Sequence, residues 1–281
     1  MLRWPRRFAP LVLILTAFTL VLPNTSARAS QDRELEIFLD VTGFDVVLES
    51  LRLSAEIAPE MLGLESDDFG AEWSRLVVEV FEPQLIQGMA LDILSQTLDD
   101  DLREHAVRFY GSDLGRRLVA VENKSHITED QALKTESGQS ILEGLRRIDS
   151  PRIDILQRLN DASNVNDGSV RAIQEVQIRF LMAAAAAGVI ELRMEEADLR
   201  EAMRSQQDEL RAAIRAGGLA DAAYTYQAFS DEEMSTYADA LSEPDMQTVY
   251  ALMNAIQFEI MADRFEEIAQ RLALMQPSQD L

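Results

Sequence analysis

Apolar residues recur at intervals of three and four along most of the chain, the spacing that places side chains on one face of an α-helix. Two segments show the pattern clearly: Phe44, Val47, Leu48 and Leu51 in the first, and Leu85, Met89 and Ile93, after Pro83, in the second. Pro83 suits the first turn of a helix, where the backbone N–H has no helical partner. No run alternates apolar and polar residues between turn dipeptides, so the sequence predicts an all-α protein without a sheet.

Residues 170–216 contain no proline and a single glycine, Gly188. The apolar stripe of this stretch consists of Ile173, Val176, Phe180, Leu181, Leu199, Met203, Leu210 and Ile214. It predicts one long helix or two nearly collinear helices, ending at Gly217-Gly218. Earlier breaks are predicted at Asp149-Ser150-Pro151 and in a polar loop over residues 160–169.

The first 29 residues have the three parts of a secretory signal peptide. Arg3, Arg6 and Arg7 precede an apolar run over residues 8–22, and Ala27-Arg28-Ala29 supplies the small-x-small cleavage pattern. We expect cleavage after Ala29 and a periplasmic or secreted bacterial protein. An uncleaved anchor helix is the alternative, but the run is shorter than the roughly 20 residues that a membrane crossing prefers.

A second apolar run, FLMAAAAAGVI at residues 180–190, is also too short to span a bilayer. We therefore expect no integral membrane span after signal cleavage. The small side chains of residues 183–187 instead favour the close approach of a neighbouring helix.

The chain is strongly acidic, with 26 basic and 49 acidic residues and a net charge of −23. Residues 1–29 hold four of the arginines and no acid, so the chain after cleavage has a net charge of −27. Such a field repels phosphate backbones and anionic lipid headgroups, which disfavours nucleic-acid binding and electrostatic membrane docking. The chain has no cysteine, so disulfides, thiolate metal sites and cysteine nucleophiles are excluded.

Two segments, residues 99–123 and 231–255, form an internal repeat at a separation of 132 residues. Their apolar positions coincide: Leu102, Phe109, Leu114 and Val121 align with Met234, Leu241, Met246 and Met253. Both begin with an acidic cluster that favours a helix start, and both break at turn residues, Gly111-Ser112 and Ser242-Glu243-Pro244. The repeat predicts a helical bundle of two related antiparallel-helix halves, residues 30–160 and 170–276, joined by a loop at 161–169.

The break at Gly111-Ser112 predicts a corner between two packed helices, with Gly at the end of the first and Ser capping the second. Gly115 follows in the first turn of the second helix. A glycine there costs about 1 kcal/mol relative to alanine. Its presence therefore predicts a neighbouring backbone too close for a side chain, whereas Gln247, at the aligned position of the second copy, is expected to tolerate substitution.

The same corner resembles a bacterial envelope family, domain of unknown function 2059 (DUF2059). The matching residues are Asp99 to Asp101, Phe109, Tyr110, Ser112, Leu114 and Gly115. The second copy departs from the pattern, with Leu241-Ser242 for Phe-Tyr, Pro244 for Ser and Gln247 for Gly. The resemblance covers residues 40–123 and, more faintly, 172–255. It implies a secreted helical protein and no established activity.

Candidate chemistry is sparse, and each candidate has a structural interpretation that we favour. His105 and His126 lack the spacing of a metal site, and Asp99 to Asp101 lack the alternating ligands of a calcium loop. Ser112 is expected to be a helix cap, and Phe109-Tyr110 are expected in the core, not in a ligand groove. The sequence thus predicts no catalytic, cofactor-binding or metal-binding residue, no cofactor and no enzymatic activity.

Two hypotheses about function follow. The first is a non-catalytic periplasmic or secreted interaction protein that holds a protein or peptide partner on apolar helix faces. The second is a carrier or sensor of an apolar ligand in a cavity between the halves, because methionine-rich helices adapt to varied ligands. A cavity of several hundred cubic ångströms between the halves favours the second hypothesis.

Overall fold

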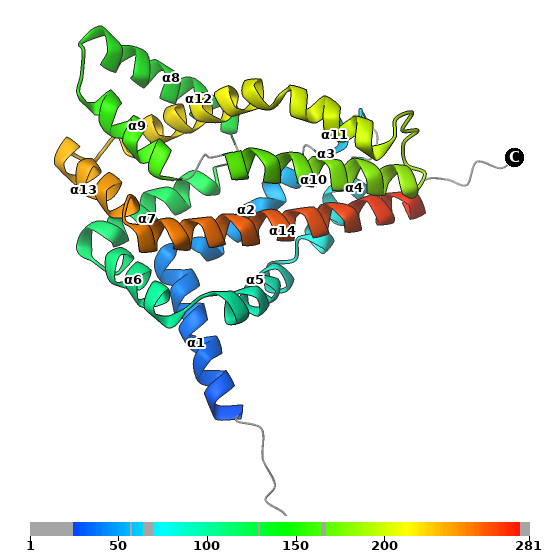
Figure 1. The fold of residues 1–281 in the computed structure, drawn as a ribbon, viewed down its shortest axis with the longest axis horizontal. Coiled ribbons are helices and arrows are strands. Elements are labelled where there is room, and N and C mark those ends of the chain that lie inside the picture. Colours follow the sequence, from blue (N-terminus) through cyan, green and yellow to red (C-terminus); the bar gives the residue numbers. More distant parts are fainter. Residues whose placement is uncertain (1–24, 57, 64–69, 129, 164–166, 276–281) are drawn as a thin grey trace, which may run out of the picture.

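The computed structural model of the protein describes residues 25–56, 58–63, 70–128, 130–163 and 167–275 (Figure 1). These residues form α-helices and no strand, which confirms the predicted all-α class. The helices are α1 (Thr25–Thr42), α2 (Phe44–Glu56), α3 (Ala58–Met61), α4 (Gly70–Val80), α5 (Pro83–Thr97), α6 (Asp100–Tyr110), α7 (Asp113–His126), α8 (Gln131–Arg147), α9 (Arg152–Ala162), α10 (Asp167–Ala186), α11 (Glu196–Ser205), α12 (Gln207–Thr225), α13 (Asp231–Leu241) and α14 (Pro244–Met275).

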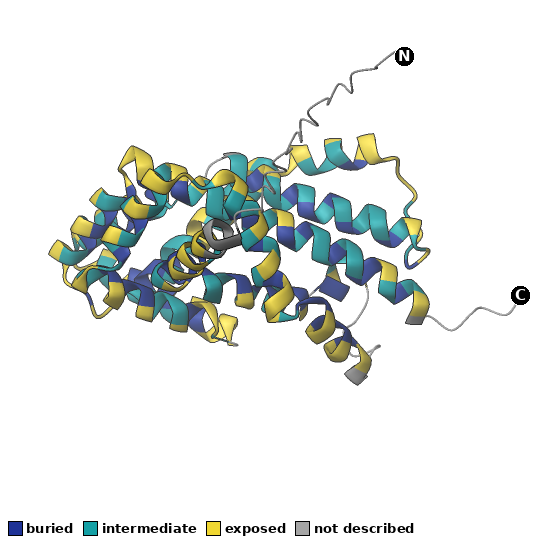
Figure 2. Cartoon of the chain, turned by 90° about the horizontal axis from the view of Figure 1, so that it is seen from below, coloured by how far each residue is buried: buried dark blue, intermediate teal, exposed yellow. Residues whose placement is uncertain are grey.

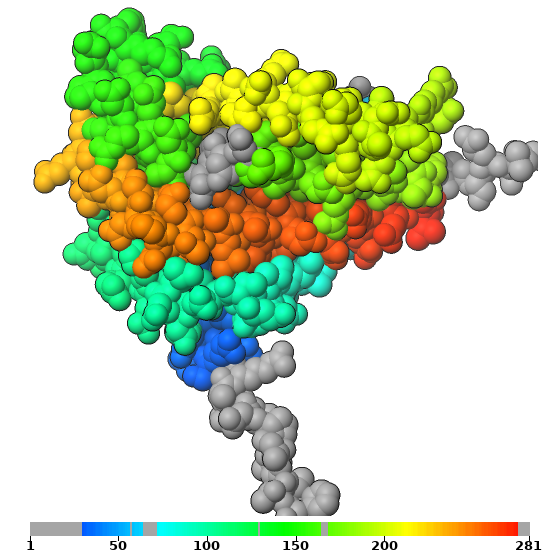
Figure 3. All heavy atoms as spheres, viewed as in Figure 1, coloured from blue at the N-terminus to red at the C-terminus, as the bar shows by residue number. Residues whose placement is uncertain are grey.

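The long helix α14 is the centre of the fold. It packs against α10 on one side and against α5 and α6 on the other, as Figures 1 and 3 show, and it also contacts α4. Ile256, Ile260, Phe265 and Leu272 of α14 are all buried. A helix that is apolar on several sides must be covered on several sides, which explains its central place. Figure 2 shows the buried residues on the inward faces of the surrounding helices.

One contiguous core joins helices from both predicted halves. Phe38 of α1, Tyr110 of α6, Phe180 of α10 and Phe265 of α14 are buried in the same cluster. A smaller cluster lies between α8, α9 and α12 and consists of Leu142, Leu156, Ala220, Ala222 and Ala223.

Helices α8 and α12 cross at very short range. A Cβ at Gly138 of α8 would lie 2.1 Å from the carbonyl oxygen of Ala220 in α12, so only glycine fits the crossing. Beside the crossing, the buried Lys134 ammonium lies 2.5 Å from the Asp221 carboxylate. The pair fixes α8 against α12 next to the candidate site described below.

The predicted corner is confirmed. Helix α6 ends at Tyr110 and α7 begins at Asp113, and the Ser112 hydroxyl accepts a hydrogen bond from the Gly115 N–H at 3.0 Å. A Cβ at Gly115 would lie 2.3 Å from the Phe109 carbonyl oxygen. Gly111 ends α6 as predicted, and its backbone is right-handed (φ −75°), so this helix end does not use the left-handed conformation that glycine allows.

The corner recurs at α13 and α14, with a separation that differs from the predicted one. The starts and ends of the paired helices, 100 and 231, 110 and 241, 113 and 244, are 131 residues apart, not 132. The alignment of Gln247 with Gly115 is therefore wrong, because Met246 takes the place of Gly115. Gln247 is itself half-buried, and its amide donates to the carbonyl oxygens of Leu241 and Ala162. Since α7 has 14 residues and α14 has 32, similarity of the complete halves stays a prediction.

The prediction of one long or two collinear helices over residues 170–216 is wrong. Helix α10 ends at Ala186, Gly188 adopts a left-handed conformation (φ 74°), and α11 and α12 follow. Helix α12 packs back against α10, so the chain reverses. The expected helix end at Gly217-Gly218 lies inside α12, where a Cβ at Gly218 would lie 2.5 Å from the Asn160 side-chain oxygen.

Helix α5 buries a different stripe from the predicted one. Ile86, Ala90 and Leu94 are buried, whereas Leu85 is 43% exposed. Two predicted helix boundaries agree with the structure. Pro83 begins α5, and residues 148–151 separate α8 from α9. Helix α9 runs to Ala162 and α10 begins at Asp167, so these helices take up much of the predicted loop 160–169.

Residues 1–24 of the predicted signal peptide lie outside the described residues, and the predicted cleavage after Ala29 falls within α1. In the part of the chain that the structure describes, no helix has both the length and the apolarity required to cross a membrane.

Candidate functional site

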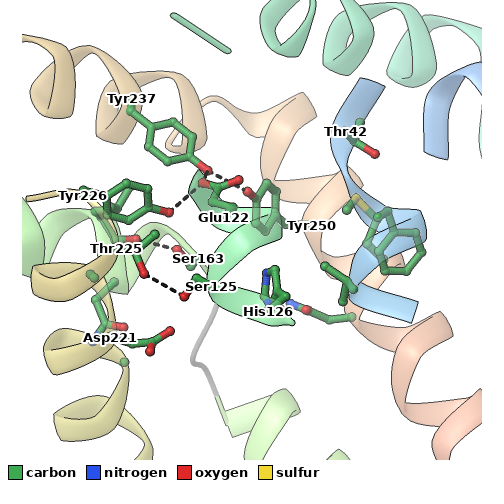
Figure 4. A pocket seen from close by; sticks show the side chains of 18 of the residues that line it. Thr42, Glu122, Ser125, His126, Ser163, Asp221, Thr225, Tyr226, Tyr237 and Tyr250 are labelled. Atoms are coloured by element: carbon green, nitrogen blue, oxygen red, sulfur yellow. Dashed lines mark hydrogen bonds between the residues drawn. The ribbon is translucent and has the colours of Figure 1, made fainter. Parts of the chain in front are cut away.

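Four of the five tyrosines in the chain belong to one hydrogen-bonded cluster at the carboxylate of Glu122 in α7. Figure 4 shows three of them, Tyr226, Tyr237 and Tyr250, beside Glu122. Tyr110 ends α6, Tyr226 follows α12, Tyr237 lies in α13 and Tyr250 lies in α14. Four helices and the residue after a fifth therefore meet at this point, which lies between segments far apart in the sequence.

The hydroxyl groups form a continuous hydrogen-bonded network. Those of Tyr226 and Tyr237 both donate to the same Glu122 oxygen, Oε1, at 2.6 and 2.7 Å. The Tyr250 hydroxyl lies 3.1 Å from that of Tyr237 and 2.5 Å from that of Tyr110. The Phe109 ring stacks on the Tyr237 ring, with centroids 5.8 Å apart. The donors satisfy Oε1, and the stacked rings fix where they point.

Helical spacing explains why Glu122 faces inward. Gly115, Leu118 and Val119 of α7 are buried. Glu122 follows Leu118 by four residues and Val119 by three, so it lies on the same face of the helix. A carboxylate on a buried face is tolerated only where donors surround it. The tyrosines supply those donors.

Burial raises the pKa of Glu122 above its ordinary value, while the hydrogen bonds from Tyr226 and Tyr237 partly offset the rise. Burial, followed by the negative charge of Glu122, raises the pKa of the Tyr226 and Tyr237 hydroxyls well above their ordinary value. Both phenols therefore keep their protons at neutral pH and remain hydrogen-bond donors.

The second oxygen of Glu122 is different. Among the described residues, no hydrogen bond from the protein reaches Oε2, and the carboxylate lines a cavity of about 310 Å³. The cavity lies between α2, α7, α9, α12 and α14. Its lining consists of Thr42, Phe44, Val47, Glu122, Ser125, His126, Leu159, Asn160, Ser163, Gly218, Asp221, Ala222, Thr225, Tyr226, Tyr237, Tyr250, Met253, Asn254 and Gln257.

The charges around the cavity are unbalanced. Two carboxylates line it, those of Glu122 and Asp221, and none of the lining residues just named is Arg or Lys. Asp221 is paired with Lys134, but no ion pair includes Glu122 among the described residues. The cavity therefore presents one uncompensated carboxylate.

The residues considered from the sequence fall in several places. His105 of α6 lies 3.2 Å from the carboxylate of Glu243, away from the cavity, whereas the exposed His126 lines it. Ser112 is the helix cap that was expected, and Asp100 pairs with Arg103 at 3.2 Å. Within the described residues, no three or more His, Asp or Glu side chains are placed to hold a metal ion.

The tyrosine network was missed from the sequence. Tyr110 was expected in the core, and it is buried there, but its hydroxyl belongs to the network. Tyr226 and Tyr237 are 104 and 115 residues from Glu122, so no local spacing connects them. The available signal was compositional, since an apolar core that includes tyrosines must supply partners for their hydroxyl groups.

The model of a family described as "Uncharacterized protein conserved in bacteria (DUF2059)" matches residues 84–143, which include α6, α7 and the corner between them. No curated protein and no solved structure matches the chain. Residues 84–143 therefore match the bacterial family DUF2059, as predicted for the first copy, while the second copy stays a prediction.

Proposed function

We propose that this protein is a non-catalytic carrier or sensor that binds a small ligand in the cavity beside Glu122. The observation that carries the proposal is the Glu122 carboxylate, with one oxygen held by two tyrosines and the other without a protein hydrogen bond in the described part. Glu122 is partly buried, so its second oxygen is an acceptor that a molecule in the cavity can reach.

The lining of the cavity supports this proposal. Phe44, Val47 and Met253 provide apolar surface, while Asn254 and Gln257 provide amide donors and acceptors. Ligand sites usually combine mostly apolar walls with a few polar groups that orient the ligand. A volume of about 310 Å³ lies at the lower end of the range for such sites, so the ligand is a small molecule.

The location of the cavity favours the ligand hypothesis over binding of a protein on apolar helix faces. Thr42, Phe44 and Glu122 come from the first predicted half, and Tyr237, Tyr250 and Met253 from the second. Exposed large apolar residues are instead spread over several helices and connections, with Val78, Ile127 and Ile148 as examples. We also propose no catalysis, because the neighbouring phenols hold their protons.

The test uses the protein isolated from its own cells and two variants that fill the cavity, Val47→Phe and Asn254→Phe. Native mass spectrometry should find a small molecule bound to the wild type and absent from both variants. A library of small molecules should raise the melting temperature of the wild type more than that of the variants.

Wild type and variants that are equally ligand-free and respond equally to the library would overturn the proposal. A co-purifying protein that both variants retain would support the alternative hypothesis of a protein partner.

A further inference from the structure

The charges of the cavity define the chemistry of its ligand. Resting on the proposed function, we infer that the ligand is a small organic cation whose ammonium N–H donates to Glu122 Oε2. The inference uses three features of the lining: the free carboxylate oxygen, the absence of Arg and Lys among the lining residues identified above, and the aromatic rings around the carboxylate.

The charge balance in the cavity favours a cation. The Lys134 ammonium, 5% exposed, neutralises Asp221, but Glu122 has no such partner among the described residues. An uncompensated carboxylate in a partly buried site attracts a cation and repels an anion. The acidic surface acts in the same direction, because a net charge of −23 raises the local concentration of cations.

The hydrogen bonds at Glu122 favour a ligand with N–H donors. The hydroxyl groups of Tyr226 and Tyr237 direct their protons to Oε1, so they leave Oε2 as the acceptor available to a ligand. An ammonium group has several N–H donors and no acceptor, which complements this oxygen. A bond between ammonium and carboxylate is charge-assisted and roughly twice as strong as a neutral one.

The lining of the cavity favours an organic cation over a metal ion. Calcium takes about six to eight oxygen ligands, whereas Glu122 has one oxygen free and Asp221 is engaged by Lys134. The rings of Phe44, Tyr226, Tyr237 and Tyr250 are also part of the lining. Aromatic rings attract organic cations through cation–π interactions and favour apolar groups attached to the ammonium.

The test compares three molecules of similar shape by isothermal titration calorimetry: benzylammonium, neutral benzyl alcohol and anionic benzoate. On the wild type, benzylammonium should bind at least about tenfold more tightly than benzyl alcohol, the effect of a charge-assisted bond, and benzoate should bind most weakly. Glu122→Gln should remove the preference for the cation. Glu143→Gln, which removes an exposed carboxylate on α8, should retain it.

Each outcome decides the inference. Equal or tighter binding of benzyl alcohol or benzoate overturns it, and so does a failure of all three molecules to bind. A loss of preference in Glu143→Gln equal to that in Glu122→Gln also overturns it, because the effect then belongs to the acidic surface.

If Glu122→Gln does not fold, the order of the three molecules on the wild type still decides. Binding of benzyl alcohol that Val47→Phe abolishes would leave the proposed function standing while this inference fails. A small molecule found on the protein from its own cells tests the proposed function independently of these three.

Discussion

Replacing Gly115 by alanine tests the close contact that forms the corner between α6 and α7. The new Cβ would lie 2.3 Å from the Phe109 carbonyl oxygen and 2.5 Å from the Tyr110 Cα. An ordinary contact between carbon and a carbonyl oxygen is about 3.3 Å or more, so the two helices must separate by about 1 Å. Both neighbours are backbone atoms, which cannot rotate away as a side chain can.

The magnitude follows from two opposing effects. Overpacking of this kind costs about 1–3 kcal/mol, and the rigid backbone favours the upper end of that range. Alanine gains about 1 kcal/mol over glycine inside a helix. We therefore expect Gly115→Ala to lower the free energy of unfolding by about 2 kcal/mol, the difference between the two.

The assay is urea unfolding followed by circular dichroism, with Gly217→Ala as the matched control. Gly217 is also inside a helix, α12, but a Cβ there would meet no atom within 4 Å. The control should therefore be more stable than the wild type, by about 0.5–1 kcal/mol. A Gly115→Ala protein as stable as the wild type would refute the close approach at the corner.

Three further predictions concern the surroundings of the site. Because burial raises the pKa of Glu122 above 4.5, ionisation of this side chain disfavours the folded state. Urea unfolding should therefore show that Glu122→Gln is more stable than the wild type at about pH 7. The difference in stability should shrink as the pH falls through the raised pKa toward 4.5. A difference independent of pH would contradict this assignment. Lys134→Met should lower the free energy of unfolding in urea by about 1–2 kcal/mol, less than the loss of a fully buried ion pair, because the Asp221 side chain is 47% exposed. Adding Asp221→Asn should recover part of this loss, and fully additive effects of the two substitutions would count against the ion pair. Gly138→Ala should lower the thermal unfolding midpoint, because its Cβ would meet the Ala220 carbonyl oxygen at the crossing of α8 and α12, and an unchanged midpoint would argue against that crossing.

Local signals in the sequence predicted the corner because its chemistry is local. The Ser112 cap bonds Gly115 three residues later, and Gly115 meets the end of the preceding helix. The buried stripe predicted for α5 was wrong because this helix carries apolar residues on two adjoining faces. Packing against α1, α2 and α14 buries Ile86 and leaves Leu85 43% exposed, a choice that depends on distant segments.

Two glycines led to wrong predictions of where helices end: one interrupts a predicted helix, and the other lies inside a helix that was predicted to end there. The prediction of a helix that continues through Gly188 is wrong, because this residue adopts the left-handed conformation that permits the reversal after α10. Gly218 suggested a helix end, yet it lies within α12, where the Asn160 side chain packs against it. The sequence alone does not distinguish glycine needed for conformation from glycine needed for space.

The candidate site was beyond sequence reasoning because its parts are brought together only by the tertiary fold. Each tyrosine taken singly has the pattern of a core residue. Glu122 is one of 49 acidic residues, and nothing in its local sequence distinguishes it from the others. The contact of Tyr237 and Tyr226 with Glu122 depends on the packing of α13 and on the end of α12, which no local pattern predicts.

The most direct test of ligand binding in the cavity is nuclear magnetic resonance of the protein with ¹³C-labelled tyrosine rings. Tyr226, Tyr237 and Tyr250 line the cavity, while Tyr224 does not and serves as an internal reference. Titration with benzylammonium or benzyl alcohol should shift the signals of the three lining tyrosines in a saturable way and leave that of Tyr224 in place. Unchanged signals from the three tyrosines with both molecules, or a shift confined to Tyr224, would contradict the account.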